Sequence, residues 1–263
     1  MTEERRIALL VEYEGTAYAG SQLQGNAPTI QGALEEAIYR LTGEKRRVTM
    51  AGRTDAGVHA KGQVASFLTQ RPYPSYTFVD GLNRYLPEDI AVLAAAEVPI
   101  SLNVRGHARR RWYRYTMCLR PARLVLLRRF AWHVPGPLDL EAMAQATSLL
   151  EGEHDFAAFT TPAFNRRTIR HVYRCHLWWR GNLVFLDMEA NAFLPQQVRR
   201  TVGALIEIGK GRLPLSVLEE WLQHRPPGAA YWAAPPHGLC LMRVYYDEEI
   251  FGHGVETTQD LPA

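Results

Sequence analysis

The two halves of the chain repeat one succession of apolar periodicities, and this succession limits the folds open to the sequence. Runs that alternate predict strands, and runs with apolar residues three and four apart predict helices. The first half gives, in order, strand 7–13, a helix between Thr29 as N-cap and Gly43, strands 47–50 and 63–68, helix 76–86 stopped by Pro87, and strand 90–98. The order is β-α-β-β-α-β.

The second half is expected to follow the same order. Its elements are strand 112–119, helix 139–151, strands 170–179 and 183–189 around the turn at 180–182, helix 194–208 with Pro195 near its start, and strand 239–246. We therefore predict an α/β (α+β) protein of two ferredoxin-like (RRM-like) halves, 1–105 and 106–263, with antiparallel sheets that meet at a central basic cleft. Residues 247–263 are expected to form a loosely held polar tail.

Composition excludes several classes of protein. The 263 residues suffice for one large or two ordinary domains, and no apolar run is long enough to span a membrane. The segment after Met1 lacks a signal-peptide apolar region, which predicts a cytoplasmic protein. The three cysteines are widely spaced and the nine histidines lack ligand spacing, so neither a disulfide scaffold nor a metal is expected.

Positive charge is concentrated in one segment. Nine arginines and no acidic residue lie between Arg105 and Arg129, although the net charge is only +3. Arginine suits phosphate groups and stacks on bases, so the segment indicates a nucleic-acid partner. A genome rich in GC codons would explain arginine in place of lysine, but not the local absence of acids. The arginines predicted to contact RNA are Arg105, Arg109, Arg110, Arg111 and Arg114.

The segment A-G-R-T-D-A-G-V-H-A, residues 51–60, places Asp55 in a loop between two expected strands. A lone Asp in a tight turn commonly bonds its own backbone. Here Arg53, Asp55, His59 and Lys61 bring more polar function together than a simple hairpin requires. From the residues alone, a catalytic carboxylate and a turn-forming one both remain open.

Two further segments carry candidate residues. In F-L-P-Q-Q-V-R-R-T-V-G, residues 193–203, Arg199 lies beside an apolar helical stripe, whereas Arg200 fits a solvated position. In R-R-R-W-Y-R-Y, residues 109–115, Tyr113 and Tyr115 share one face of a strand. Aromatic side chains on a sheet flanked by arginines can stack on RNA bases, although a core position is favoured for Tyr115.

These motifs resemble the tRNA pseudouridine synthase A family. G-R-T-D-A-G-V-H-A is similar to its active-site signature, and further similar segments are Y-E-G-T-A-Y-A-G-S-Q-L-Q (13–24), L-N-R-Y-L-P-E-D-I (82–90), E-G-E-H-D-F-A-A-F (151–159) and P-P-H-G-L-C-L-M-R-V (235–244). The resemblance implies an isomerase that converts uridines 38, 39 and 40 of the tRNA anticodon stem-loop to pseudouridine. It also implies a homodimer in which one tRNA contacts both subunits, with no cofactor.

The resemblance implies a role for each candidate. Asp55 would be the nucleophile, Arg199 its salt-bridge partner, and Tyr113 the residue that stacks on the target base. The substrate-binding set would be Arg53, Thr54, His59, Leu239 and Leu241, the two leucines forming the floor of the uracil pocket.

The chain departs from the family pattern at several positions. Ser21 stands where tryptophan is usual, Glu14 replaces Asp, and residues 102–108 and 195–197 differ from the usual segments. None of these departures coincides with Asp55, Tyr113 or Arg199.

Two other functions remain possible on the sequence. A non-catalytic RNA-binding module would have the same halves and basic strands but no use for Asp55. A nucleoside hydrolase or glycosylase would use two carboxylates, and the Asp55 loop offers one.

Overall fold

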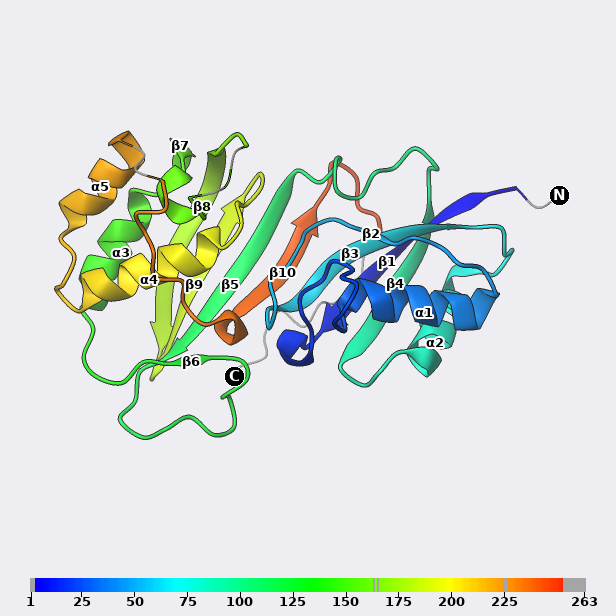
Figure 1. The fold of residues 1–263 in the computed structure, drawn as a ribbon, viewed down its shortest axis with the longest axis horizontal. Coiled ribbons are helices and arrows are strands. Elements are labelled where there is room, and N and C mark those ends of the chain that lie inside the picture. Colours follow the sequence, from blue (N-terminus) through cyan, green and yellow to red (C-terminus); the bar gives the residue numbers. More distant parts are fainter. Residues whose placement is uncertain (1–2, 163, 165, 225–226, 253–263) are drawn as a thin grey trace. The chain divides into compact units, whose positions relative to one another are not determined.

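The computed structural model describes residues 3–162, 164, 166–224 and 227–252 (Figure 1). This part of the chain is a mixed α/β fold with five α-helices and mainly antiparallel strands. It divides into two compact units. The first comprises the chain up to Arg109 together with the chain from Leu241 onward, and the second comprises Arg110–Cys240.

The first unit has the expected element order. It contains β1 (Arg5–Tyr13), α1 (Ile30–Thr42), β2 (Thr49–Met50), β3 (His59–Thr69), α2 (Ser75–Tyr85) and β4 (Ile90–Val98). β1 pairs antiparallel with both β3 and β4, and the short β2 pairs with β3. The region between β2 and β3, residues 51–58, forms the loop that carries Asp55.

Helix boundaries in this unit follow their capping residues. The Thr29 hydroxyl accepts a hydrogen bond from the Gly32 N–H at 3.2 Å, and Gly43 ends α1 in the left-handed conformation with φ 74°. Phe78 of α2 packs edge-on against Phe67 of β3, with ring centroids 5.7 Å apart. These residues confirm the predicted N-cap and C-cap of α1 and attach α2 to the sheet.

The second unit contains elements that the periodicity did not predict. Its elements are β5 (Arg110–Cys118), β6 (Trp132–His133), α3 (Leu140–Ser148), β7 (Gly152–Asp155), β8 (Ile169–Arg180), β9 (Leu183–Ala190), α4 (Gln197–Gly209) and α5 (Leu215–His224). Its strands are ordered β5-β9-β8-β7, with β6 parallel to β5. β6, β7 and α5 were not expected, because the first two are too short to show a period.

Helix α4 starts later than predicted. Gln196, with φ 61°, occupies the left-handed region and serves as N-cap, so Pro195 precedes the helix. The expectation that Pro195 lies inside the first turn was wrong. The stripe formed by Val198, Val202, Leu205 and Ile206 is buried as predicted.

The last strand, β10 (Leu239–Tyr245), crosses the division between the units. The chain from Leu241 onward therefore belongs with the first unit, whereas the expected division at residue 105 placed all of it in the second half. Two residues of the expected tail are also attached, since Asp247 pairs with Arg109 at 2.7 Å and Glu249 pairs with Arg243 at 3.3 Å. The remainder of the expected tail, 253–263, lies outside the described residues.

Two kinds of feature are absent from the described residues. No helix in the described part of the chain is both long enough and apolar enough to cross a membrane. No group of three or more His, Cys, Asp or Glu side chains in the same residues could hold a metal ion.

Candidate active site

Asp55 lies in the loop between β2 and β3, and its side chain is half-buried. The loop turns directly after it, because the Val58 N–H donates to the Asp55 carbonyl at 3.2 Å and Gly57 adopts φ 78°. Arg53 is exposed, whereas Thr54 and His59 are buried. The loop thus carries the accessible side chains of Asp55 and Arg53, and the polar side chains of Thr54 and His59 are buried beneath them.

The segment after β1 packs closely against this loop, and two glycines allow it. A Cβ on Gly15 would lie 2.0 Å from the Val58 carbonyl oxygen. Gly20 has φ 102°, and a Cβ there would lie 2.8 Å from the Thr54 carbonyl oxygen. Only residues without a side chain permit this approach, which gives the Y-E-G-T-A-Y-A-G segment a physical role.

A buried network holds the loop from below. The Tyr13 and Thr54 hydroxyl oxygens are 2.9 Å apart. Gln63 is fully buried, donates to the Gly52 carbonyl at 2.8 Å and accepts from the Gly52 N–H at 3.3 Å. Buried polar groups with all these partners make the loop rigid. Gln63 was not among the predicted site residues, although it is a polar residue at the start of the apolar run that predicted strand 63–68.

His59 is part of the same support. Its Nδ1 accepts a hydrogen bond from the Gly15 N–H at 3.0 Å, and the side chain is 5% exposed. A neutral ring that accepts at Nδ1 carries its proton on Nε2. This contact ties the ring to the segment that covers the loop.

The second unit contains Tyr113 and Tyr115 on one face of β5. Tyr113 is 7% exposed and packs edge-on against Phe193, with ring centroids 5.1 Å apart. Tyr115 is fully buried and donates to the Pro235 carbonyl at 2.8 Å. Burial raises the pKa of Tyr115, and the nearby Arg199 charge opposes this only in part. Tyr115 is thus a core residue, as expected.

Arg199 and Arg200 are adjacent on α4 but have different surroundings. Arg199 is half-buried, and its Nε donates to the Ala234 carbonyl at 2.7 Å. Arg200 is 8% exposed and donates to the Ala230 carbonyl at 2.9 Å and to Gln196 Oε1 at 3.1 Å. Burial and the Arg199 charge both lower the pKa of Arg200. The expectation of a solvated Arg200 was wrong, because the segment after α5 covers it.

The two predicted floor residues lie on β10. Leu239 is 6% exposed and Leu241 is fully buried. The structure therefore places Arg53, Thr54, Asp55, His59 and Leu241 in the first unit, and Tyr113, Arg199 and Leu239 in the second.

Most arginines predicted to contact RNA have partners within the protein. Arg109 pairs with Asp247 at 2.7 Å, and Arg110 lies 3.6 Å from Glu189. Arg111 is 9% exposed and donates to the Asn191 carbonyl at 2.7 Å, while Arg114 pairs with Asp187 at 2.8 Å. Arg105 is exposed on the connection between β4 and β5.

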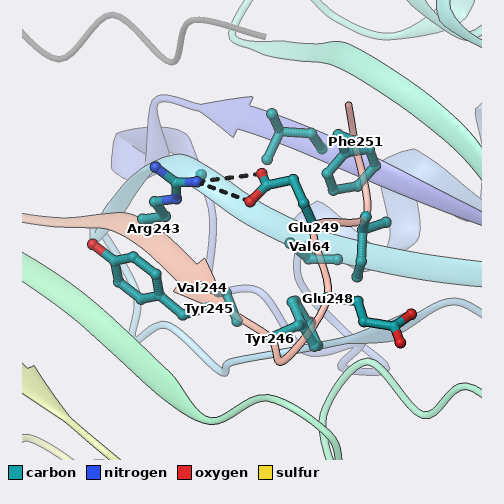
Figure 2. Close-up of a pocket in the computed structure, with 11 residues that line it drawn as sticks. Val64, Arg243, Val244, Tyr245, Tyr246, Glu248, Glu249 and Phe251 are labelled. Atoms are coloured by element: carbon teal, nitrogen blue, oxygen red, sulfur yellow. Dashed lines mark hydrogen bonds and ion pairs between the residues drawn. The ribbon is translucent and has the colours of Figure 1, made fainter. Parts of the chain in front are cut away.

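A pocket in the first unit lies between β3 and the segment after β10 (Figure 2). Val64 and Phe251 are among its lining residues, and Arg243 donates to both carboxylate oxygens of Glu249 at 3.3 and 3.4 Å. Its described lining includes none of the predicted catalytic or substrate-binding residues.

Comparison with known proteins assigns the chain to a family. The family model described as "tRNA pseudouridine synthase" matches residues 9–105 and 146–247. The tRNA pseudouridine synthase A of Pelobacter propionicus is 44% identical over 92% of this chain and 100% of its own length. The corresponding proteins of Roseiflexus castenholzii and Chloroflexus aurantiacus are each 45% identical, over 93% and 92% of this chain and 92% and 89% of their own lengths. The chain therefore belongs to the tRNA pseudouridine synthase family and is an enzyme of the isomerase class.

Proposed function

We propose that this protein converts uridines 38, 39 and 40 in the anticodon stem-loop of tRNA to pseudouridine, with Asp55 as the nucleophile. The observation that carries the proposal is the placement of Asp55. Its carboxylate is half-buried on a loop whose backbone is held by Ser21, Tyr18 and Gln63. A reacting group must be held in a productive orientation, and a loop supported by these hydrogen bonds can hold the Asp55 carboxylate in one orientation.

The reaction is an isomerisation that needs no external reactant. The bond between ribose C1′ and uracil N1 breaks, the base rotates, and a bond forms between C1′ and C5. The C5 proton is lost and N1 gains a proton, so atoms and electrons balance without a cofactor or a metal. Attack of Asp55 on C1′, its attack on uracil C6, and initial removal of the C2′ proton are all compatible with one ionised carboxylate.

The other residues take roles that follow from their chemistry. Arg199 pairs with Asp55 in this proposal, because a guanidinium keeps a carboxylate charged and oriented. Tyr113 stacks on the flipped target base, which offsets unstacking costs of a few kcal/mol. Leu239 and Leu241 form the apolar floor against which the detached uracil turns. Arg53, Thr54 and His59 complete the substrate-binding set.

Further arginines proposed to grip tRNA phosphates are those whose side chains are exposed. Arg53 and Arg105 are exposed, and so are Arg123 and Arg128 in the connection between β5 and β6. Arg128 Nη1 donates to the Val125 carbonyl at 3.2 Å. Exposed arginines of this kind contact phosphates and tRNA shape in preference to base edges.

The remaining expectations belong to the same proposal. These are two ferredoxin-like halves with a basic cleft, a homodimer in which one tRNA contacts both subunits, and a cytoplasmic location. The element order of the first unit and the antiparallel strands of the second unit support the expectation of two ferredoxin-like halves.

Unmodified tRNA carrying uridines at 38, 39 and 40 tests the proposal. We expect wild-type protein to form pseudouridine at these positions and Asp55→Asn to form none while binding the tRNA with unchanged affinity. Conversion by the variant would refute the nucleophile assignment. If wild-type protein binds without conversion, an RNA-binding module is the better account, and release of free uracil would indicate a glycosylase.

A further inference from the structure

Ser21 binds both main-chain polar groups of Thr54, the residue directly before Asp55. The Ser21 hydroxyl accepts a hydrogen bond from the Thr54 N–H at 2.9 Å. The Ser21 N–H donates to the Thr54 carbonyl at 3.1 Å. Ser21 is 1% exposed, so water does not compete for these contacts.

The geometry points to a positioning role for Ser21 in the reaction proposed for Asp55. The Thr54 carbonyl and the Asp55 nitrogen belong to one planar peptide unit. A hydrogen bond to that carbonyl therefore orients the peptide plane that contains the Asp55 nitrogen and Cα. With the Thr54 N–H also bound, the peptide units on both sides of Thr54 are oriented by a single residue.

Ser21 is itself held by a rigid element. The Gln31 N–H in the first turn of α1 donates to the Ser21 carbonyl at 3.0 Å, and the Ile30 N–H donates to the Gly20 carbonyl at 3.3 Å. The catalytic loop is thus connected through Ser21 to the start of a helix. Sites supported by helices hold their geometry more closely than sites on unsupported loops.

The side-chain contact depends on serine at this position. The Ser21 hydroxyl oxygen is the acceptor for the Thr54 N–H, and an apolar side chain of similar size has no such acceptor. Ser21 therefore supports the loop through its side chain as well as through its main-chain N–H.

Ser21→Ala removes the hydroxyl and leaves the rest of the residue in place. Ser21→Cys is a second variant of similar size whose thiol accepts hydrogen bonds only weakly. The matched control is Thr42→Val, because the buried Thr42 hydroxyl also accepts a main-chain N–H, that of Glu44 at 3.1 Å, in the same unit. Thr42 lies at the end of α1, and its hydrogen-bond partners among the described residues are Ile38, Glu44 and Arg71.

Steady-state kinetics and amide hydrogen exchange are measured on all variants of the full chain. We expect Ser21→Ala to lower kcat about 10- to 100-fold with the KM for tRNA within about twofold, because the carboxylate is misplaced while tRNA binding is unaffected. The Thr54 amide should exchange faster, whereas the Ala51 amide, bound to the Val64 carbonyl at 2.8 Å, should not change. Thr42→Val should keep wild-type kcat.

The outcomes separate this inference from the proposed function on which it rests. Wild-type kcat in either folded Ser21 variant, with Asp55→Asn inactive, overturns the positioning role alone. An equal loss of kcat in Thr42→Val and Ser21→Ala shows a general effect of stability and also overturns it. Turnover by Asp55→Asn refutes the proposed function whatever the Ser21 variants do.

Discussion

Asp187 and Arg114 form a two-pronged ion pair on neighbouring strands of the second unit, with the carboxylate 4% exposed. Arg114 Nε and Nη2 donate to the two oxygens at 2.8 and 3.1 Å. The indole N–H groups of Trp112 and Trp178 also donate to Asp187, each at 2.8 Å. An arginine chosen from sequence as an RNA contact thus forms part of an internal polar cluster.

Removing that carboxylate is expected to destabilise the protein. Asp187→Ala leaves a largely buried guanidinium and two indole N–H groups without their acceptor, which costs about 3 kcal/mol or more of the free energy of unfolding. Asp247→Ala is the matched control, because its pair with Arg109 is about two-thirds exposed on both sides and should contribute nothing measurable. Urea denaturation compares them, and equal midpoints would contradict the prediction.

Substitution of Arg199 should mainly lower activity, whereas substitution of Arg200 should mainly lower stability. Arg200→Ala leaves the Ala230 carbonyl without its donor, so we expect the free energy of unfolding to fall by about 1–3 kcal/mol. Arg199→Ala should lower kcat at least 100-fold with a smaller change in stability, since Arg199 is proposed to orient the nucleophile. Thermal denaturation and single-turnover kinetics measure the two effects. A larger loss of kcat in Arg200→Ala than in Arg199→Ala would contradict the role proposed for Arg199.

Gly15→Ala should impair catalysis through backbone crowding. The added Cβ would lie 2.0 Å from the Val58 carbonyl oxygen, so the loop that carries Asp55 must shift. We expect kcat to fall at least tenfold and stability to fall by about 1–3 kcal/mol. Gly25→Ala is the control in the same segment, because a Cβ there has no neighbour within 4 Å. Unchanged kcat in Gly15→Ala would show that the loop tolerates displacement.

The exposed arginines between β5 and β6 should set the salt dependence of tRNA binding. Each of Arg123→Ala and Arg128→Ala is expected to lower the slope of log K against log salt by about one unit, the value for one lost phosphate contact. Arg47→Ala is the control, because Arg47 is similarly exposed but pairs with Glu35 at 3.1 Å. Binding is measured over a series of potassium chloride concentrations. Slopes that do not change would exclude this connection from the tRNA interface.

Glu44 should contribute to acid sensitivity. Burial by itself would raise the pKa of Glu44, but the Thr69 hydroxyl at 2.7 Å and Arg46 at 3.1 Å stabilise its carboxylate and lower the pKa below 4.5. A group with a lowered folded pKa stabilises the protein above its unfolded pKa and loses that effect as pH falls through the folded value. Wild type should therefore be more stable than Glu44→Gln at pH 7, with a difference that shrinks below about pH 4.5. A difference that does not vary with pH would contradict this.

Much of the secondary structure could be predicted, because local patterns determine it. The N-cap Thr29, the C-terminal Gly43 and the turn at 180–182 act within a few residues of themselves, and each lies where it was expected. β6 and β7 are two and four residues long and show no period. Gln196 adopts φ 61°, so α4 begins after it. The helix propensities of the residues do not predict this left-handed conformation.

The sequence by itself determined the family, the catalytic candidate Asp55 and the order of the main elements, because motifs and periodicities are patterns of residues that are close together in the chain. Only the tertiary structure decided which polar groups have partners. Ser21 and Thr54 are 33 residues apart and Arg114 and Asp187 are 73 apart, yet the pairs form hydrogen bonds of 2.9 and 2.8 Å, respectively, each alongside a second one of 3.1 Å. Whether an arginine meets RNA or a buried carboxylate depends on strands brought together by folding, and such contacts leave no local pattern in the chain.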